Sequence, residues 1–357
     1  MHLESTASDG APTDRTTTLL GLTPSEFTRA VGELGEPRYR AEQVLQWVYG
    51  RGVAAFDQMS NLPRRFRDTL AQKLTIYQSQ IVCRRDSTDG TIKLLLQWPD
   101  GASSECVLIP EARRRTACVS TQVGCPAGCV FCASGIGGLQ RNLTAAEIIE
   151  QTMRIRDLCA SGTRLSNVVF MGLGEPLANY GATVGAIRAI NAPWGMDIGA
   201  RKITVSTVGL PSKMNALADE QLQITLALSL HAPNDTLRRE IIPWAQRVDL
   251  DELVAACDYY FKRTGREVTL EYILLAGVND TAHHAEELAE LSKRMRSNIN
   301  LIRYNPVEGL PFARPDSDQA QLFLGVLRER GVSAHLRKSR GLDVTAACGQ
   351  LRRQQDA

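Results

Sequence analysis

Three cysteines lie within eight residues of one another, Cys125, Cys129 and Cys132 in the segment GCPAGCVFC. They are separated by three and then two residues, and they follow an apolar stretch that is typical of a strand. Iron–sulfur clusters usually take four cysteine ligands, so a compact set of three predicts a four-iron cluster whose last iron binds a small molecule. The spacing favours a cluster that binds and cleaves S-adenosylmethionine.

A structural zinc site is the alternative use of such cysteines. Zinc sites normally combine two short CxxC units, or close all four positions with a Cys/His set. No second pair and no nearby His follows Cys132 within the usual window. The spacing therefore favours iron–sulfur chemistry, and a non-enzymatic, zinc-stabilised RNA-binding module remains the alternative.

Composition limits the other possibilities. At about 100–200 residues per domain, 357 residues predict one large domain and a smaller one. The net charge of +2 predicts that any nucleic-acid surface is local. Nine cysteines, no signal-peptide pattern and no apolar run of membrane length favour a reducing cytoplasm and no membrane partner.

The elements that must position these cysteines can be expected from apolar periodicity. Residues 1–15 are small and polar, which predicts a disordered tail. Residues 16–76 repeat apolar side chains every three or four positions, which predicts a small helical module. In residues 77–116 the period changes to short strands with hairpin turns at Asp89-Gly90 and Asp100-Gly101.

Residues 117–350 alternate between β-rich and helical stretches, and 351–357 form a short tail. Repeated βα units predict a mainly parallel sheet, either an open doubly wound sheet or a complete or partial barrel. The strand candidates are residues 117–123, 167–173, 202–208, 224–230, 268–275, 299–305 and 333–339, and the clearest helical stretches between them are 144–159, 250–265 and 283–295.

Polar segments follow these strand candidates, and ligands of parallel sheets bind beyond the carboxyl ends of strands. Each segment alone is ordinary turn composition. Their shared location is what predicts a site. The segments are the cysteine triplet, Gly172–Pro176, Ser206–Gly209, Ser229–His231, Asn305-Pro306, Gly341 and Ala346–Gly349.

The order of these motifs resembles the radical S-adenosylmethionine methyltransferases that modify adenosine in 23S ribosomal RNA, with a tRNA adenosine as a second substrate in the main branch. The resemblance covers nearly the whole chain, and its least generic pieces are RNLTAAEIIEQ and AACGQL. It implies an α/β fold: a partial (β/α) radical-SAM barrel with a small amino-terminal helical domain, which would bind RNA, and a short antiparallel β extension.

The resemblance also implies roles for individual residues. Cys125, Cys129 and Cys132 would ligate a 4Fe–4S cluster, and two S-adenosylmethionine molecules would be used per turnover. His231 alone is more often a packed imidazole, and its contact could come from the backbone. The implied S-adenosylmethionine contacts are Gly174, Glu175, Ser206, Ser229, Leu230, His231 and Asn305.

Two further cysteines carry the implied reaction. Adenine C2 and C8 are electron-poor carbons that cannot displace a methyl group, but a carbon radical can add to them. By resemblance, Cys348 is methylated, a 5′-deoxyadenosyl radical abstracts hydrogen from that methyl, and the product attacks the ring. Glu105 would accept the ring proton, and Cys118 would release the RNA by attacking the Cys348 sulfur, leaving a disulfide bond. The other cysteines outside the triplet are expected to be packed side chains: Cys83, Cys106, Cys159 and Cys257.

The implied partners are 23S rRNA, tRNA and an electron donor such as flavodoxin or ferredoxin, and the chain is expected to be a monomer. The long helical module favours C2 methylation, and C8 methylation by the antibiotic-resistance branch is the alternative. RNA needs local basic surface, although charge runs are usually solvated faces. The candidates are Arg38 and Arg40 flanking Tyr39, Arg64, Arg65, Arg67, Arg113–Arg115, Arg337, Lys338 and Arg340.

Overall fold

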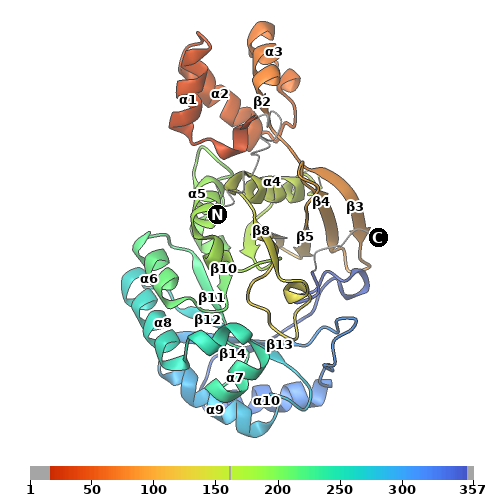
Figure 1. The fold of residues 1–357 in the computed structure, drawn as a ribbon, viewed down its shortest axis with the longest axis vertical. Coiled ribbons are helices and arrows are strands. Elements are labelled where there is room, and N and C mark those ends of the chain that lie inside the picture. Colours follow the sequence, from red (N-terminus) through yellow and green to blue (C-terminus); the bar gives the residue numbers. More distant parts are fainter. Residues whose placement is uncertain (1–16, 161, 352–357) are drawn as a thin grey trace, which may run out of the picture. The chain divides into compact units, whose positions relative to one another are not determined.

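The structure, a computed structural model, describes residues 17–160 and 162–351. The expected amino-terminal tail lies outside these residues, as does the expected carboxy-terminal tail except for Leu351. The chain divides between Gln78 and Ser79 into two compact units (Figure 1).

The first unit is a helical module, as its apolar spacing predicts. Thr23 begins the first long helix with a capping box, since its hydroxyl accepts from the Glu26 N–H while the Glu26 carboxylate accepts from the Thr23 N–H. Phe27 and Phe66 from two of the helices are buried. The elements are β1 (Thr17–Thr18), α1 (Pro24–Glu33), α2 (Tyr39–Leu45), a π-helical turn (Gln46–Gly50), α3 (Arg64–Lys73) and β2 (Leu74–Thr75), with β1 and β2 paired in parallel.

Ten strands of the second unit form one sheet. They are β3 (Gln80–Asp86), β4 (Ile92–Gln97), β5 (Ser103–Glu111), β6 (Arg114–Cys118), β9 (Asn167–Phe170), β10 (Ile203–Thr207), β11 (Thr225–Ser229), β12 (Val268–Leu274), β13 (Ser297–Arg303) and β14 (Ala334–Arg337). Their order is β14-β13-β12-β11-β10-β9-β6-β5-β4-β3. The strands from β14 to β6 are parallel, and β5, β4 and β3 continue the sheet in antiparallel pairing. The predicted parallel barrel and antiparallel extension are therefore one continuous layer.

Helices connect the parallel strands. They are α4 (Ala145–Arg156), α5 (Tyr180–Asn191), α6 (Pro211–Asp219), α7 (Asp235–Ile241), α8 (Leu250–Thr264), α9 (Ala282–Lys293) and α10 (Ser317–Glu329). Helices α6, α8, α9 and α10 lie along the outside of the curved strand layer in Figure 1, as in a partial (β/α) barrel. Throughout residues 17–160 and 162–351, no helix is both long enough and apolar enough to cross a bilayer.

The first parallel strand, predicted over residues 117–123, lies at Arg114–Cys118, so it begins three residues earlier and ends five residues earlier than predicted. Strand β6 ends at Cys118, because the Ser120 N–H donates to Oε1 of Gln151 in α4 at 2.9 Å and leaves the strand ladder. The chain then forms a separate strand, β7 (Gln122–Gly124), which pairs with β8 (Leu139–Asn142). The loop that carries the three cysteines connects these two strands.

Candidate active site

A cavity lies where the parallel strands end, as expected for this class of sheet. Its wall combines the cysteine loop, the residues that follow β9, the ends of β10 and β11, and the last described residues of the chain. Most of the expected site residues line it: Cys125, Cys129, Cys132, Gly174, Glu175, Ser206, Ser229, His231 and Cys348. Leu230, Asn305, Cys118 and Glu105 lie outside this lining.

The three cysteines are half-buried and belong to one compact loop. The Cys132 N–H donates to the Cys129 carbonyl at 3.1 Å, and the Cys125 N–H donates to the Gly138 carbonyl at 3.2 Å. Gly124 begins the loop with φ +80°, and a Cβ there would lie 2.0 Å from the Gly138 oxygen. Only glycine fits this close approach of backbone to backbone.

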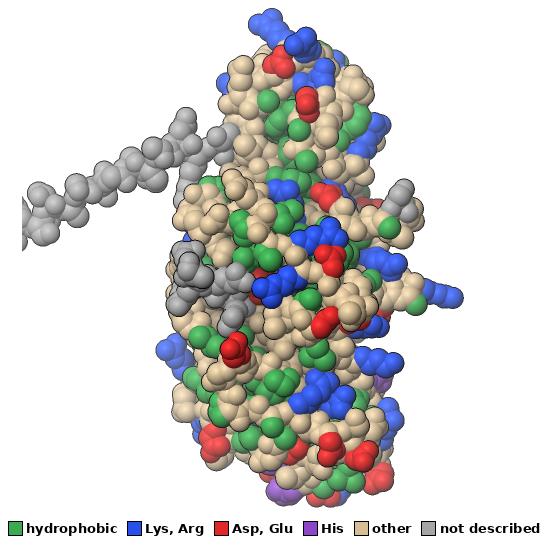
Figure 2. Space-filling view, turned by 90° about the vertical axis from the view of Figure 1, so that its right-hand side faces the viewer, with side chains coloured by type: hydrophobic (Ala, Val, Ile, Leu, Met, Phe, Trp, Pro, Cys, Tyr) green, Lys and Arg blue, Asp and Glu red, His purple; other side chains and the backbone are tan. Residues whose placement is uncertain are grey.

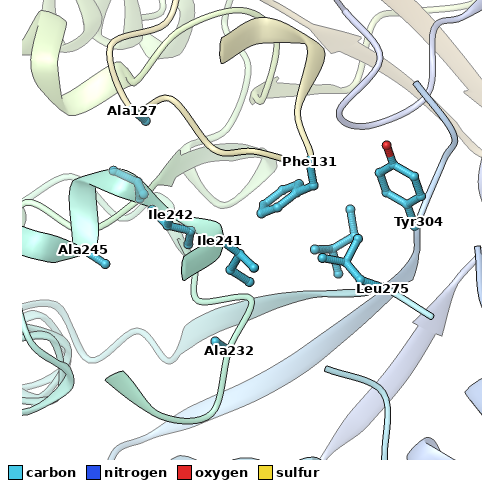
Figure 3. Packing of buried hydrophobic residues seen from close by; sticks show 10 residues of the cluster. Ala127, Phe131, Ala232, Ile241, Ile242, Ala245, Leu275 and Tyr304 are labelled. Carbon is cyan, nitrogen blue, oxygen red and sulfur yellow. The ribbon is translucent and has the colours of Figure 1, made fainter. Parts of the chain in front are cut away.

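An apolar cluster packs against one side of the cysteine loop. Phe131 points toward Ile241 of α7 in Figure 3, and its ring meets His231 edge-on at 5.1 Å between centroids. The Val130 N–H also donates to the Ile241 carbonyl at 3.1 Å. All three cysteines pack against this cluster, so their sulfurs are shielded from water on that side.

This burial decides the ionisation of the thiols. Desolvation raises the pKa of Cys125 to about 12 and raises the pKa of Cys129 and Cys132 above the usual thiol range. The thiols are thus neutral unless a cationic centre binds them as thiolates. Arg238, which is fully buried, supplies one nearby positive charge beside Cys129.

The donor set fits an iron–sulfur cluster better than a single ion. Within the described ranges, no three His, Cys, Asp or Glu side chains converge closely enough to hold one metal ion. In a 4Fe–4S cluster each thiolate binds a different iron, so the cysteine sulfurs surround the cluster and do not need to meet at one metal ion. Three soft donors in an apolar pocket suit such a cluster.

Glu175 is a buried carboxylate that joins two strand ends. Its Oε1 accepts from the Leu177 N–H at 2.9 Å, and its Oε2 accepts from the Val208 N–H at 2.7 Å. Burial raises the pKa of Glu175 to about 7, and these hydrogen bonds oppose the rise. Gly174 beside it has φ +105°, and a Cβ there would lie 2.6 Å from the Gln122 Cβ. The carboxylate is therefore fixed in position at the cavity wall.

The remaining cavity residues differ in how free their side chains are. Ser206 and Ser229 lie side by side, with their hydroxyl oxygens 3.1 Å apart. Nδ1 of His231 accepts from the Ile273 N–H at 3.1 Å, and burial lowers the pKa of His231 to about 3. The imidazole is therefore neutral and already has a structural partner. Leu230 is buried, and its N–H donates to the Glu271 carbonyl at 3.0 Å.

Asn305 contacts the segment that carries Cys348. Its Nδ2 donates to the Cys348 carbonyl at 3.0 Å. Its Oδ1 accepts from Arg314 at 2.9 Å and from the Ser339 hydroxyl at 2.7 Å. The amide group of Asn305, the expected S-adenosylmethionine contact, thus fixes the backbone at Cys348.

Cys348 lies between two cavities. It lines the first cavity and also a second, smaller one whose wall includes Asn305, Arg337, Lys338 and Arg340. Cys348 is exposed because it faces these openings. The protein around it nevertheless desolvates the thiol and raises the pKa of Cys348 to about 11. The positive charge of Arg337 opposes this rise. Three of the expected basic residues therefore lie beside Cys348.

Cys118 and Glu105 share one face of the sheet. Cys118 pairs with Val107 across β5 and β6, and both pack against Ala346 and Leu351 near Cys348. Glu105 lies two residues before Val107 and therefore projects to the same face. Burial raises the pKa of Cys118 to about 12, nearby Cys348 adds to the rise, and Arg337 opposes it.

All nine cysteines are free thiols in this structure, so the disulfide expected between Cys118 and Cys348 is not formed in it. Cys106 and Cys257 are fully buried, as expected for packed side chains, and Cys83 and Cys159 are half-buried.

Sequence reasoning missed three buried charged residues around the site: Lys93, Arg238 and Glu271. Lys93 forms an ion pair with Glu105 at 2.8 Å, and Glu271 lines the first cavity. Lys93 and Glu271 each stand as a single charge inside an apolar strand, in IKLLLQ and VTLEYIL. A charge at a buried strand position was the available signal, because such residues are rarely buried without a partner.

The fold and the cavity together define a radical S-adenosylmethionine enzyme. Residues 119–291 match the family model described as the Radical SAM superfamily, whose members use a 4Fe–4S cluster and S-adenosylmethionine. Residues 17–76 match the model described as the ribosomal RNA large subunit methyltransferase N-terminal domain.

Relatives along the whole chain identify the family within that superfamily. The chain is 48% identical over 337 residues to the probable dual-specificity RNA methyltransferase RlmN of Thermosynechococcus vestitus, covering 94% of this chain and 98% of the relative. It is 45% identical to the protein of that name from Salinibacter ruber, with 90% of each chain covered. The crystal structure of a radical SAM methyltransferase from Sphaerobacter thermophilus matches with a TM-score of 0.92 and 45% identity, covering 94% of this chain and 99% of that one. The chain belongs to the RlmN family of dual-specificity RNA methyltransferases.

Proposed function

We propose that this enzyme methylates C2 of an adenosine in 23S rRNA and of an adenosine in tRNA, with Cys348 as the methyl carrier. The observation that carries this proposal is the position of Cys348, which lines both the cavity of the three cysteines and the basic cavity beside Arg337. A residue that receives a group on one side and delivers it on the other needs access to both.

Cys125, Cys129 and Cys132 would hold the 4Fe–4S cluster, which supplies the electron that turns S-adenosylmethionine into a source of radicals. Glu175 would accept hydrogen bonds from the methionine ammonium group, because it is a carboxylate held at the cavity wall. Ser206 and Ser229 would contact the nucleoside part of the molecule. Leu230 and His231 would contribute through the backbone, since their side chains are buried or already paired.

The chain's own groups would then complete the transfer to RNA. The Cys348 sulfur would carry the methyl carbon to adenine. Glu105 would accept the ring proton. The Cys118 thiolate would then attack the Cys348 sulfur and break its bond to the transferred carbon, which takes up a proton and leaves with the RNA as a methyl group, while a Cys118–Cys348 disulfide forms. The shared face of Cys118, Glu105 and the segment around Cys348 supports these roles. Asn305 would contact S-adenosylmethionine and would also fix the backbone of Cys348 during these steps.

RNA would bind through local basic surface. Figure 2 shows Lys and Arg side chains dispersed over the visible face, interspersed with acidic ones, which agrees with a net charge of +2. We infer that residues 16–76 are the RNA-binding accessory domain, that 77–116 extend the sheet, and that 117–350 are the catalytic barrel. Arg337, Lys338 and Arg340 in the second cavity would neutralise phosphates next to the flipped base.

The match of residues 17–76 to a ribosomal RNA methyltransferase domain supports C2 over C8 methylation. We further propose a monomer in the cytoplasm that receives electrons from flavodoxin or ferredoxin.

The test is to incubate the anaerobically reconstituted enzyme with 23S rRNA fragments and tRNA, and to measure the modified nucleosides by mass spectrometry. We expect 2-methyladenosine in both RNAs and none with Cys348→Ala. Formation of 8-methyladenosine would favour the antibiotic-resistance branch. Purification with zinc and no sulfide, together with no methyladenosine, would overturn the proposal in favour of a zinc-stabilised module.

A further inference from the structure

Lys93 is a buried cation next to Glu105. Its side chain is only 6% exposed, and it follows Ile92 at the start of an apolar strand. Its Nζ lies 2.8 Å from Glu105 Oε1 and also donates to the carbonyl and the hydroxyl of Thr345, both at 3.1 Å. An ammonium group has three N–H donors, and these three contacts match them.

The ion pair holds a buried carboxylate in place. Glu105 is 1% exposed, and removing one partner of such a pair leaves an uncompensated charge in a poorly solvated place. The proposed proton acceptor therefore depends on Lys93.

The two other Lys93 contacts fix the segment that carries Cys348. We call residues 341–351 the carboxy-terminal strap. The strap is held on the β3–β4 hairpin because the Gly341 N–H donates to Asp89 at 3.0 Å and Asp343 accepts from the Ser87 hydroxyl at 2.5 Å. Of the hairpin's contacts with the strap, the one between Lys93 and Thr345 lies closest to Cys348 along the chain.

Thr345 has a strained backbone that needs this support. Its φ of +50° is uncommon for a residue with a branched Cβ. Such a conformation persists only where the surroundings hold it. Lys93 binds both the carbonyl and the hydroxyl of Thr345, three residues before Cys348.

We propose that Lys93 is a positioning residue that couples the proton acceptor to the methyl carrier, because the same ammonium group pairs with the Glu105 carboxylate and binds the strap at Thr345. The inference rests on the proposed roles of Glu105 and Cys348. It adds a residue that fixes the position of Glu105 relative to the Cys348 segment, although these lie far apart in the chain.

The first test compares Lys93→Met with Lys202→Met, a control at an exposed lysine. We expect Lys93→Met to slow release of methylated RNA at least tenfold, with covalent protein–RNA adduct accumulating, and to speed amide exchange in residues 342–351. Lys93→Arg should restore release at least in part, because it keeps the charge. Release at the wild-type rate by Lys93→Met would overturn the proposal.

A second pair of variants covers the case in which Lys93→Met does not fold. Glu105→Gln keeps Lys93 and its contacts with Thr345, whereas Lys93→Met/Glu105→Gln removes both charges and leaves no unpaired carboxylate. We expect faster amide exchange in the strap of the double variant than in Glu105→Gln, and no further loss of RNA release. Equal strap exchange in the two proteins would contradict the proposal. Strap exchange needs neither RNA nor turnover, so it decides the role of Lys93 even if the wild-type enzyme forms no RNA adduct and the proposed function fails.

Discussion

The thiol of Cys118 lies in surroundings that keep it protonated at neutral pH. It is buried against Val107, Ala346 and Leu351, and this burial raises its pKa to about 12. The nearby Arg337 guanidinium opposes the rise. A thiolate, not a thiol, attacks sulfur. The release step assigned to Cys118 therefore depends on a small thiolate fraction.

This gives a pH dependence with a defined sign. Below a pKa of about 12, the thiolate fraction of Cys118 grows about tenfold per pH unit, so release of the Cys348–RNA adduct should accelerate by up to about tenfold per unit from pH 7 to 9. The measurement is single-turnover release after rapid pH jumps. Cys118→Ala should retain the adduct at every pH, and a release rate that stays flat in the wild-type enzyme would argue against thiolate attack by Cys118.

At the scale of elements, the cysteine loop depends on the close approach of two short strands. Gly124 ends β7, where a Cβ would overlap the Gly138 oxygen just before β8. The loop between these strands carries all three cysteines. Its geometry is therefore set by backbone packing as well as by the apolar cluster around Phe131.

Gly124→Ala should distort this loop. A non-glycine residue at φ +80° costs about 1–3 kcal/mol before the overlap with Gly138 is counted, so we expect a lower melting temperature and less than half the wild-type iron content. Gly325→Ala is the matched control, because it lies within α10 and a Cβ there meets nothing within 4 Å. Full iron content in Gly124→Ala would show that the loop tolerates the side chain.

The elements also show what the sequence could and could not predict. Six of the seven parallel strands were predicted within a few residues, because runs such as TLALS and VTLEYIL are apolar and rich in strand-forming residues. The end of β6 was wrong, because a side chain 31 residues away, Gln151, takes the Ser120 N–H. The contact of Lys93 with Thr345 joins residues 252 apart, so no local pattern predicts it.

At the scale of the whole molecule, we propose separate functions for the two units, RNA binding and methyl transfer. The described residues that line the cavity of the three cysteines belong to the second unit. The first unit carries strongly exposed arginines on α3, among them Arg64 with a side chain 88% exposed. These features support our proposal that the first unit binds RNA and that the second transfers the methyl group.

Reversing charge on α3 should separate these functions. Arg64→Glu/Arg65→Glu should weaken RNA binding severalfold at low salt and lower the slope of log affinity against log salt by about 1–2, because phosphate contacts are lost. Methylation of Cys348 should be unchanged. Lys262→Glu/Arg263→Glu, on exposed positions of α8, is the control with equal charge change. Equal loss of affinity in the two variants would point to net charge alone.

The most direct test of the account follows one carbon atom through Cys348. The enzyme is first methylated at Cys348 with S-adenosylmethionine labelled with carbon-13 in its methyl group, then purified and reacted with RNA and unlabelled S-adenosylmethionine in a single turnover. Because Cys348 faces both cavities and would carry the methyl carbon between them, we expect the labelled carbon in 2-methyladenosine. Unlabelled methyladenosine, with the label still on Cys348, would contradict the account.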